Sequence, residues 1–494
     1  MYIGVDLGTS SIKIVLVDRN DKVLEFSSRS IPTERPSIGH SEQDPNRWFE
    51  ALLDGFDELS SKAEKDMKRV EGIGLSGHMH SAILMDSTDK PIGNAILHND
   101  VRAEKEAHEL NEKFPDLAEK AGVIAMPGFT GPKLLWLSRN EPEKFKQAKY
   151  ILFAKDFLRL KLTGTIATDV TDAAGSWLFD QKKRKWSEEC ISACNSDNFV
   201  LPSIFESPSS CGILKSEFSI RWKLPKDILV AAGAGDVACG GVAVGAVDES
   251  SGFISMGTAA QVFLGSKKFE PKTKKLVHSF CHALPSTWFN MAALLNGTSV
   301  MDKVLSWTSE KNIENLIFSA ESKFQGPGDL LALPYLSGER TPHNDSKIRG
   351  AIIGLNHSTA TEDITLAFLE SIAFSLADGV DALLEDKAKL KNLILIGGGS
   401  KSDFFAQLIA NVLNISIDTC LSSAYAPSIG AARLARLAAK NESEEDVIVA
   451  LPVTKTFRVD QAMHAKYAEK LKQFRVLYKQ LRNLDNLDNV LLTC

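Results

Sequence analysis

Asp6 is the first residue of the sequence whose type and surroundings suggest chemistry. It lies near the end of an apolar run at residues 2–7, which a Gly8-Thr9 pair separates from a second apolar run. Val- and Ile-rich runs around a tight turn predict a β-hairpin, and the backbone N–H groups and hydroxyls of such a turn can hold phosphate oxygens. A carboxylate beside a phosphate requires a cation, so Asp6 indicates a Mg²⁺ site. The alternative is an ordinary hairpin with a surface Asp.

Asp236 is a second carboxylate in a position suited to catalysis. It follows a buried apolar run at residues 228–235 and precedes a Gly- and Ala-rich run that predicts a tightly packed helix up to Gly245. The dipole of that helix favours the ionised carboxylate at its N-terminus. A general base must be ionised and within hydrogen-bond reach of the hydroxyl that it deprotonates. Asp236 is therefore a candidate base, with a helix N-cap as the alternative role.

The plan of the first hairpin recurs in the second half of the chain. Residues 252–264 again contain a β-type run, a Gly257-Thr258 pair and a second β-type run. Internal repeats of this kind indicate a duplicated architecture. This plan, in which two related halves each offer a phosphate-holding hairpin to a shared cleft, resembles the sugar kinase, actin and heat-shock chaperone ATPases. The members of that superfamily differ in function, so the resemblance does not choose one.

A run of three glycines marks another turn suited to ligand binding. Gly397, Gly398 and Gly399 follow a buried strand-type run at residues 392–396 and precede a helix that starts near Ser402. Glycines at such a turn let the backbone approach a phosphate or a base closely. The turn lacks the G-x-G-x-x-G spacing of a Rossmann fold and the Lys of a Walker A motif. The sequence predicts a nucleotide-binding turn of another type, or a tight strand–helix connection without a ligand.

Polar side chains also close a strand-type run in the first half. Residues 70–76 predict a strand, and His78, Met79 and His80 follow it after one glycine. Two imidazoles at a strand end suit the recognition of ligand hydroxyl groups. A metal site is disfavoured because neither histidine has an obvious carboxylate or Cys partner. A structural histidine with internal hydrogen bonds remains the alternative for each.

These residues require a scaffold of two large domains. A chain of 494 residues exceeds the size of one hydrophobic core. We predict an α/β fold with two domains, residues 1–247 and residues 248–494. Apolar periodicity predicts a long helix at residues 362–384, and residues 169–176 are expected to form a polar loop of small residues. After the second hairpin, helices are expected up to Lys323.

Composition and charge indicate what kind of protein and partners to expect. The formal net charge is −6, from 57 Lys and Arg against 63 Asp and Glu, which gives no reason to expect nucleic acid or an anionic membrane as a partner. Cys190 and Cys194 lack the pattern of a zinc site, and Cys239 and Cys281 are expected to be buried. The N-terminal residues do not resemble a signal peptide, and no run reaches the length of a membrane span. We expect a protein of the reducing cytoplasm.

The motifs occur in the order seen in the FGGY carbohydrate kinases, and the chain resembles that family over nearly its whole length. Residues 128–137 look like the first signature of the family. Within it, the resemblance is closest to the bacterial xylulokinases and is carried by residues 126–130, 278–285 and 335–344. The ordered set comprises residues 5–10, 77–80, 98–100, 169–176, 235–236, 255–258, 336–342 and 397–399. The resemblance implies two actin-like ATPase (ribonuclease H-like) domains with an interdomain cleft.

The resemblance also implies a role for each candidate residue. Asp236 matches the general base of the family, and Asp6 matches the acid near the Mg²⁺–phosphate site. The sugar-binding residues are expected to be Met79, His80, His78, Asp100 and Asp236 itself. The ATP-binding residues are expected to be Gly8, Thr9, Gly257, Thr258, Gly398, Gly399 and Ser402. Residues 1–247 are thus expected to carry the sugar site and the base, residues 248–494 to bind ATP, and Mg²⁺ to accompany the nucleotide.

The implied reaction is transfer of the γ-phosphoryl group of ATP to a ketose, with the 5-hydroxyl of D-xylulose as the expected acceptor. Two positions depart from the family pattern. His78 stands where xylulokinases commonly have Gln, and His98 where they commonly have Trp. We expect a His at position 78 to titrate near neutral pH. A kinase for another pentulose, polyol or sugar acid therefore stays an alternative.

Two other classes of function share the superfamily fold. A chaperone-like ATPase is disfavoured because no separate peptide-binding domain follows the two halves. A catalytically silent sugar sensor is disfavoured because Asp6 and Asp236 are both present. The sequence leaves the oligomeric state open, with a homodimer as one option.

Overall fold

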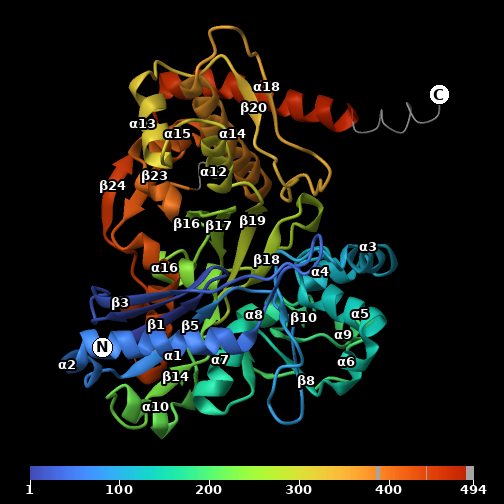
Figure 1. Ribbon diagram of the computed structural model, residues 1–494, viewed down its shortest axis with the longest axis vertical. Coiled ribbons are helices and arrows are strands. Elements are labelled where there is room, and N and C mark those ends of the chain that lie inside the picture. Colours follow the sequence, from blue (N-terminus) through green and yellow to red (C-terminus); the bar gives the residue numbers. More distant parts are fainter. Residues whose placement is uncertain (385–389, 441, 485–494) are drawn as a thin grey trace.

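The computed structural model describes residues 1–384, 390–440 and 442–484, and it consists of two halves that lie one above the other in Figure 1. The first half is built on a mixed sheet. Its strands, in spatial order, are β13 (Ser210–Ile213), β14 (Leu229–Ala231), β5 (Gly72–Gly77), β1 (Tyr2–Leu7), β2 (Ser11–Val17) and β3 (Val23–Ser30), and β15 (Ala234–Gly235) also pairs with β5. β1 runs antiparallel to β2 and parallel to β5.

The second half repeats this plan. Its sheet comprises, in spatial order, β18 (His278–Cys281), β19 (Trp288–Leu294), β17 (Ala260–Ser266), β16 (Gly252–Met256), β22 (Asn392–Ile396), β23 (Ser416–Cys420) and β24 (Val453–Phe457). β16 runs antiparallel to β17 and parallel to β22, as β1 does with β2 and β5. The repeat in the sequence is therefore a repeat of the same sheet unit, as predicted.

Short sheets and helices surround the two main sheets. The small sheets pair β4 (Glu42–Gln43) with β7 (Ala95–Ile96), β6 (Ile83–Met85) with β8 (Tyr150–Leu152), β9 (Ala167–Asp169) with β12 (Ser203–Phe205), β10 (Phe179–Asp180) with β11 (Lys185–Trp186), and β20 (Leu331–Leu333) with β21 (Ala351–Ile353). The helices of the first half are α1 (Pro45–Lys62), α2 (Glu64–Met67), α3 (Glu104–Lys113), α4 (Leu117–Ala121), α5 (Thr130–Asn140), α6 (Pro142–Gln147), α7 (Ala154–Thr163), α8 (Val170–Ala174), α9 (Glu188–Ala193), α10 (Ser216–Arg221) and α11 (Asp236–Val244). Those of the second half are α12 (Ser299–Ser306), α13 (Ile313–Ser322), α14 (Thr361–Leu383), α15 (Asp403–Leu413), α16 (Ala426–Ala439), α17 (Glu444–Val447) and α18 (Gln461–Leu484).

Apolar spacing explains how these helices attach to the sheets. In α1, Trp48, Leu52 and Phe56 recur every four residues and are fully buried, so they form one face of the helix. That face packs against β2 and β3. The N-terminus of α1 is fixed by Asp44, whose side chain accepts a hydrogen bond from the backbone N–H of Asn46.

α16 joins the two halves. It comes from the second half of the chain, yet it packs against β1, β5 and α11 of the first half, and Figure 1 shows it at the junction. The approach is backbone to backbone: a methyl group added at Gly4 would lie 1.7 Å from the carbonyl oxygen of Ser428, and one at Gly74 would lie 1.8 Å from that of Ala431. Glycine at both strand positions is what lets α16 lie this close to the sheet.

The fold corrects two local predictions and confirms others. Helix α14 spans almost the predicted residues, and α15 starts directly after Ser402. Residues 169–176 were expected to form a loop, but Val170–Ala174 are helical because the Asp169 carboxylate caps the backbone N–H groups of Thr171 and Asp172. The segment between the second hairpin and Lys323 begins with strands β18 and β19 before its helices. The domain boundary between residues 247 and 248 stays a prediction.

The structure shows the surroundings of the cysteines and the character of the helices. Cys239 and Cys281 are buried, as predicted, and Cys190 and Cys194 are also buried and free. Among the helices of the described residues, none combines the length and the apolar character that crossing a bilayer requires. The described part of the chain also has no group of three or more His, Cys, Asp or Glu side chains placed to hold a metal.

Candidate active site

Asp6 lies on β1, one residue before that strand ends, and is 8% exposed. Its Oδ1 accepts a hydrogen bond from Ser76 Oγ on β5 at 2.9 Å. Burial raises the pKa of Asp6, while the Ser76 hydrogen bond and the Lys13 ammonium act in the opposite direction. The carboxylate therefore sits at the carboxyl ends of the parallel pair β1 and β5, the edge at which ligands bind in sheets of this kind.

Asp236 is the first residue of α11 and is partly exposed. Its Oδ1 accepts a hydrogen bond from the backbone N–H of Val237 at 2.8 Å. Burial, followed by the negative charge of Asp6, raises the pKa of Asp236 to about 7. The two carboxylates thus lie close enough to influence each other, although they are separated by 230 positions in the numbering. Asp236 can accept a proton near neutral pH, which is what a general base must do.

A hydrogen-bond chain holds the turn that carries Asp236. The backbone N–H of Gly235 donates to Thr171 Oγ1 at 2.8 Å, and Thr171 Oγ1 donates to Asp169 Oδ2 at 2.6 Å. Ser207 Oγ donates to the same Asp169 oxygen at 2.7 Å. Thr171 and Asp169 are fully buried. The peptide between Ala234 and Gly235, one residue before Asp236, is therefore held from the first turn of α8.

Buried charges in turn hold Asp169. Lys155 Nζ lies 2.6 Å from Asp156, 2.8 Å from Asp169 and 3.1 Å from Asp172. Although burial opposes the charge on Lys155, the three carboxylates raise its pKa above the ordinary value. Burial likewise opposes ionisation of Asp169, but Lys155 lowers its pKa. Burial raises the pKa of Asp172 well above the ordinary value. Asp169 is thus held beside the Lys155 ammonium, where its carboxylate accepts the hydrogen bond of Thr171.

Met79 and His80 lie beside Asp236. A methyl group added at Gly235 would lie 2.5 Å from Met79 Cγ, so the Met side chain packs directly against the turn that carries Asp236. His80 has a φ of 71°, which is unusual for a residue with a side chain. Its carbonyl accepts hydrogen bonds from Lys133 Nζ at 3.0 Å and Thr130 Oγ1 at 3.1 Å, and its Nδ1 lies 2.6 Å from the carbonyl oxygen of Gly175. These contacts fix the backbone in the strained conformation.

His78 and His98 lie next to each other, with ring centroids 6.0 Å apart. His78 Nδ1 bonds Ser81 Oγ at 2.9 Å, whereas His78 Nε2 and His98 Nδ1 are buried and have no hydrogen-bond partner among the described residues. Burial lowers the pKa of His78 to about 3, with a further contribution from the positive charge of Lys133. The expectation that His78 titrates near neutral pH is therefore wrong, because burial keeps the imidazole uncharged.

Asp100 is fully buried, and both of its carboxylate oxygens accept internal hydrogen bonds. Its Oδ2 accepts from the backbone N–H of Ser41 at 2.6 Å and from Arg102 Nη2 at 2.7 Å, and its Oδ1 accepts from Arg102 N and Nε, each at 2.9 Å. Both oxygens are thus used to hold Arg102 and the chain at residue 41. A direct contact of Asp100 with the sugar stays a prediction.

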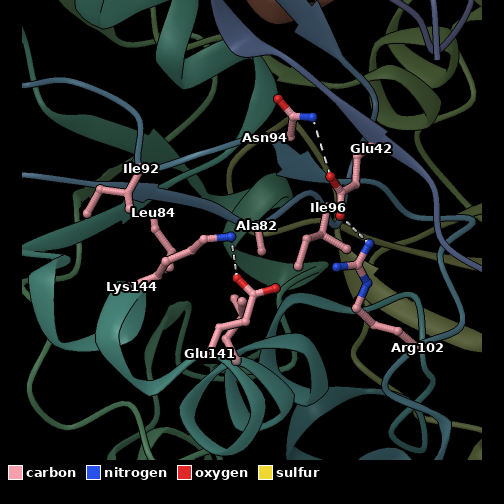
Figure 2. Close-up of a pocket in the computed structure, with 10 residues that line it drawn as sticks. Glu42, Ala82, Leu84, Ile92, Asn94, Ile96, Arg102, Glu141 and Lys144 are labelled. Atoms are coloured by element: carbon pink, nitrogen blue, oxygen red, sulfur yellow. Dashed lines mark hydrogen bonds and ion pairs between the residues drawn. The ribbon is translucent and has the colours of Figure 1, made fainter. Parts of the chain in front are cut away.

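A small cavity lies on the other side of Arg102. Figure 2 shows its polar lining paired internally: Arg102 Nη2 lies 2.6 Å from Glu42, and Lys144 lies 2.6 Å from Glu141. Asn94 Nδ2 also donates to Glu42 at 3.4 Å. The cavity has a volume of about 30 Å³, which is enough for one or two waters but not for a sugar. This cavity is therefore not the substrate site.

The two Gly-Thr turns close their hairpins as the sequence predicts. The backbone N–H of Gly8 donates to Ser11 O at 3.0 Å, and that of Gly257 donates to Ala259 O at 3.0 Å. Thr9 and Thr258 remain at least partly exposed. The turns lie at equivalent ends of β1 and β16, in the two halves. Both turns keep polar groups available for phosphate oxygens, and their contact with ATP stays a prediction.

A cavity of about 760 Å³ lies in the second half, a size that suits a nucleotide. Its lining includes Gly398, Gly399 and Ser402, three of the residues expected to bind ATP. Ser402 is the N-cap of α15, and its Oγ accepts a hydrogen bond from the backbone N–H of Phe405 at 3.2 Å. Thr298 also lines the cavity and donates through N and Oγ1 to Gly257 O at 2.7 and 2.9 Å. The second Gly-Thr turn is therefore adjacent to the cavity.

Sequence reasoning missed much of this lining. Ile313, Ile317 and Phe318 on α13 border the cavity, and Phe318 is 69% exposed. No short motif marks these residues, because their spacing looks like that of any amphipathic helix. Arg340 and His278 stand inside segments that carry the family resemblance, yet no role was assigned to either. Their neighbours in space come from distant parts of the chain.

Comparisons with known proteins agree with this arrangement. Residues 1–243 match the N-terminal domain of the FGGY family of carbohydrate kinases, and residues 252–439 match its C-terminal domain. The chain is 37% identical to the xylulose kinase of Escherichia coli over 482 residues, which cover 97% of this chain and 99% of that protein. A "xyloylose kinase" from Brucella ovis superposes with a TM-score of 0.92 at 35% identity and covers 98% of this chain and 99% of its own. A gluconate kinase from Lactobacillus acidophilus superposes with a TM-score of 0.88 at 26% identity, covering 97% of both chains.

The two domain matches together account for most of the chain, and they include both hairpins, the paired carboxylates and most of the lining of the nucleotide-sized cavity. The fold is the two-domain, actin-like ATPase fold that the sequence predicts. The chain belongs to the FGGY family of carbohydrate kinases, enzymes that transfer a phosphoryl group to an alcohol group of a sugar.

Proposed function

We propose that this enzyme transfers the γ-phosphoryl group of ATP to the 5-hydroxyl of D-xylulose. The main support for this reaction is that the Asp236 carboxylate lies close to Asp6. Both carboxylates lie at the edge of the first sheet, where Met79 and His80 are also located. The substrate is supported by 37% identity, over nearly the whole chain, to a protein named xylulose kinase.

In this proposal Asp236 accepts the proton of the attacking hydroxyl while the oxygen forms its bond to phosphorus. A pKa of about 7 allows the carboxylate to be ionised at neutral pH and still take up a proton. Phosphoryl transfer depends mainly on positioning and on charge stabilisation. The chain through Thr171 and Asp169 supplies the positioning, because it fixes the peptide next to Asp236.

The nucleotide is proposed to occupy the cavity bounded by α13 and by residues 398–405, with its phosphates directed to Gly257 and Thr258. The Gly8-Thr9 turn faces the phosphates from the first half. In this assignment residues 1–247 supply the sugar site and the base, and residues 248–494 bind ATP. α16 connects the two parts through its contact with β1 and β5.

Asp6 and Asp236 also fit a magnesium ion. Mg²⁺ is usually held by one or two carboxylates together with waters and substrate phosphates, rather than by a complete protein cage. Asp6 and Asp236 are neighbouring carboxylates. Among the described residues, no third acidic, His or Cys side chain is grouped with them, so the pair matches this requirement. When bound, Mg²⁺ would neutralise phosphate charge, with Asp6 as its proposed protein ligand.

We also propose that the enzyme works in the reducing cytoplasm. Six cysteines are buried and free in the described residues, which suits a compartment without disulfide formation. Whether the protein is a monomer or a homodimer stays a prediction. Its proposed partners are the ketose and ATP alone.

A substrate panel tests the assignment. ADP release is measured with ATP, Mg²⁺ and, in turn, D-xylulose, D-ribulose, L-ribulose, xylitol, glycerol and gluconate. The proposal expects the highest kcat/KM for D-xylulose, and it expects the product to carry phosphate on carbon 5. A higher kcat/KM for gluconate or for a polyol would contradict the substrate while leaving the family assignment intact.

A further inference from the structure

Arg340 belongs to the second half of the chain and lies close to residues of the first half. A methyl group added at Gly128, just before α5, would lie 3.7 Å from Arg340 Nη2. Beyond the dominant effect of burial, the charge of Arg340 also lowers the pKa values of His98 and His278. Arg340 therefore lies among groups from both halves, near Gly128, His98 and His278.

The guanidinium of Arg340 has no internal partner. Among the residues that the structure describes, its side chain makes no hydrogen bond or ion pair, although it is partly buried and burial lowers its pKa. The carboxylate of Glu339, its neighbour in sequence, is already used: it accepts hydrogen bonds from Leu295 N at 2.7 Å, Arg340 N at 2.8 Å and Asn296 Nδ2 at 3.2 Å. A guanidinium without a protein partner in such a place keeps its five N–H donors available to an acceptor on a ligand.

The backbone on both sides of Arg340 is fixed. Glu339 is anchored to residues 295 and 296, as described above. Thr341 N donates to Ala293 O at 3.0 Å, and Thr341 Oγ1 donates to Leu276 O at 2.9 Å. Arg340 is therefore held at the ends of β18 and β19, so its direction is set by the fold rather than by a free loop.

The groups around Arg340 are also unsatisfied. His98 Nδ1 and His278 Nδ1 are buried and lack hydrogen-bond partners among the described residues. Phe129 lies between His80 and His278, with ring centroids 4.5 and 5.7 Å away. Unpaired donors and acceptors around an aromatic ring suit a polyhydroxylated ligand, which supplies both kinds of partner.

The chemistry of the proposed substrate supplies the missing acceptor. In a 2-ketopentose, ring closure joins the 5-oxygen to carbon 2, so a free 5-hydroxyl is present only in the open-chain form. A sugar that presents its 5-hydroxyl to Asp236 must therefore bring an uncyclised carbonyl at carbon 2. That carbonyl oxygen can only accept hydrogen bonds, and Arg can only donate them.

We propose that Arg340 binds the carbonyl oxygen on carbon 2 and the oxygen on carbon 1 of the open-chain ketose, as a specificity residue contributed by the C-terminal half. This inference rests on the proposed function. Met79 and His80 then lie along the middle of the sugar, between Asp236 and Arg340. The sugar site is complete only when both halves contribute to it.

The test combines one substitution with one change in the substrate. Arg340→Gln is compared with the wild type on D-xylulose and on 1-deoxy-D-xylulose, which keeps the carbonyl but lacks the 1-oxygen. Because a site that binds a substrate oxygen discriminates against its absence, kcat/KM for D-xylulose is expected to fall about 100-fold in the variant. The fall with 1-deoxy-D-xylulose should be smaller by about tenfold, since one of the two contacts is already missing.

Two further measurements separate this inference from a loss of folding. ADP binding, measured without sugar, should stay within about twofold of the wild type, because Arg340 does not line the nucleotide cavity. Arg340→Lys should recover only part of the activity, because Lys lacks the planar two-donor geometry. Arg349→Gln provides a matched control: Arg349 is exposed and, within the described part of the chain, bonds only backbone carbonyls of its own loop.

The outcomes are distinguishable. Equal losses on both sugars, or no loss, would overturn the role of Arg340 and leave the proposed function standing. A wild-type enzyme without activity on D-xylulose would overturn the proposed function and this inference with it. A variant with weakened ADP binding would show that Arg340 acts through the fold, which also overturns the inference.

Discussion

Thr171 Oγ1 accepts a hydrogen bond from the backbone N–H of Gly235 at 2.8 Å, and this contact connects helix α8 to the turn that carries Asp236. Both residues are buried, and Thr171 Oγ1 is occupied by this bond and by its own bond to Asp169. Through this bond, however, the orientation of the Asp236 peptide depends on a buried group of charges that includes Asp169 and Lys155. Thr171 is therefore a positioning residue.

Thr171→Val tests this role because it preserves the shape of the side chain and removes the hydroxyl. An unpaired N–H at Gly235 should lower the free energy of unfolding by about 1–3 kcal/mol. Loss of orientation should lower kcat about tenfold, with little change in the KM for the sugar. Thr171→Ser, which restores the acceptor, should recover kcat. A Val variant that loses stability but keeps kcat would limit Thr171 to a structural role.

The pH dependence of the reaction should report Asp236. Burial and the charge of Asp6 raise its pKa to about 7, and only the ionised carboxylate can accept a proton. We therefore expect kcat/KM to rise with pH through about 7 and then level off. Asp6→Asn removes the neighbouring charge, so the rise should move to lower pH even though activity falls. A wild-type profile that is flat between pH 5 and 8 would contradict the assignment of the base.

His78 and His98 should influence which sugar is preferred. Each has a buried ring nitrogen without a partner among the described residues, and His78 stays uncharged near neutral pH. His78→Gln and His98→Trp should each change the ranking of D-xylulose, D-ribulose, L-ribulose and a pentitol by kcat/KM. The KM for ATP should remain unchanged, since neither residue lines the nucleotide cavity. An unaltered ranking would identify both histidines as structural.

The contact between α16 and β1 should be sensitive to a single methyl group. In Gly4→Ala the new carbon would lie 1.7 Å from Ser428 O, which belongs to a backbone that cannot move alone. We expect a loss of about 3 kcal/mol or more in the free energy of unfolding. Gly72→Ala, whose methyl group would lie 3.2 Å from Ala435 O, should lose less. Urea unfolding of the two variants measures the difference, and equal stability would contradict the close packing.

The features of this enzyme that depend on short contiguous segments can be predicted from the sequence. Asp6 and Asp236 each stand at the junction of a strand and a turn, and the two Gly-Thr hairpins repeat within one chain. The capped helix α8 was missed because small polar residues resemble a loop, although Asp169 followed by Thr171 and Asp172 is a recognisable cap. β19 was missed because an apolar run does not by itself distinguish a strand from a helix.

Long-range contacts account for what the sequence leaves open. Asp100 resembles a sugar ligand by position, yet its carboxylate is held by Arg102 and by the backbone at Ser41. Arg340 gains its significance from Gly128 and His278, which are distant from it in the chain. Such contacts depend on how the two sheets and α16 pack together, so they cannot be predicted from local sequence patterns.

Replacement of the proposed base tests the central claim most directly. Asp236→Asn keeps the size and the hydrogen-bonding shape of the side chain but cannot accept the proton. With ATP, Mg²⁺ and D-xylulose, we expect kcat to fall by a factor of about 100 to 10,000, while D-xylulose still binds to the variant in a calorimetric titration. Turnover close to that of the wild type would show that Asp236 only caps α11, and it would contradict the account.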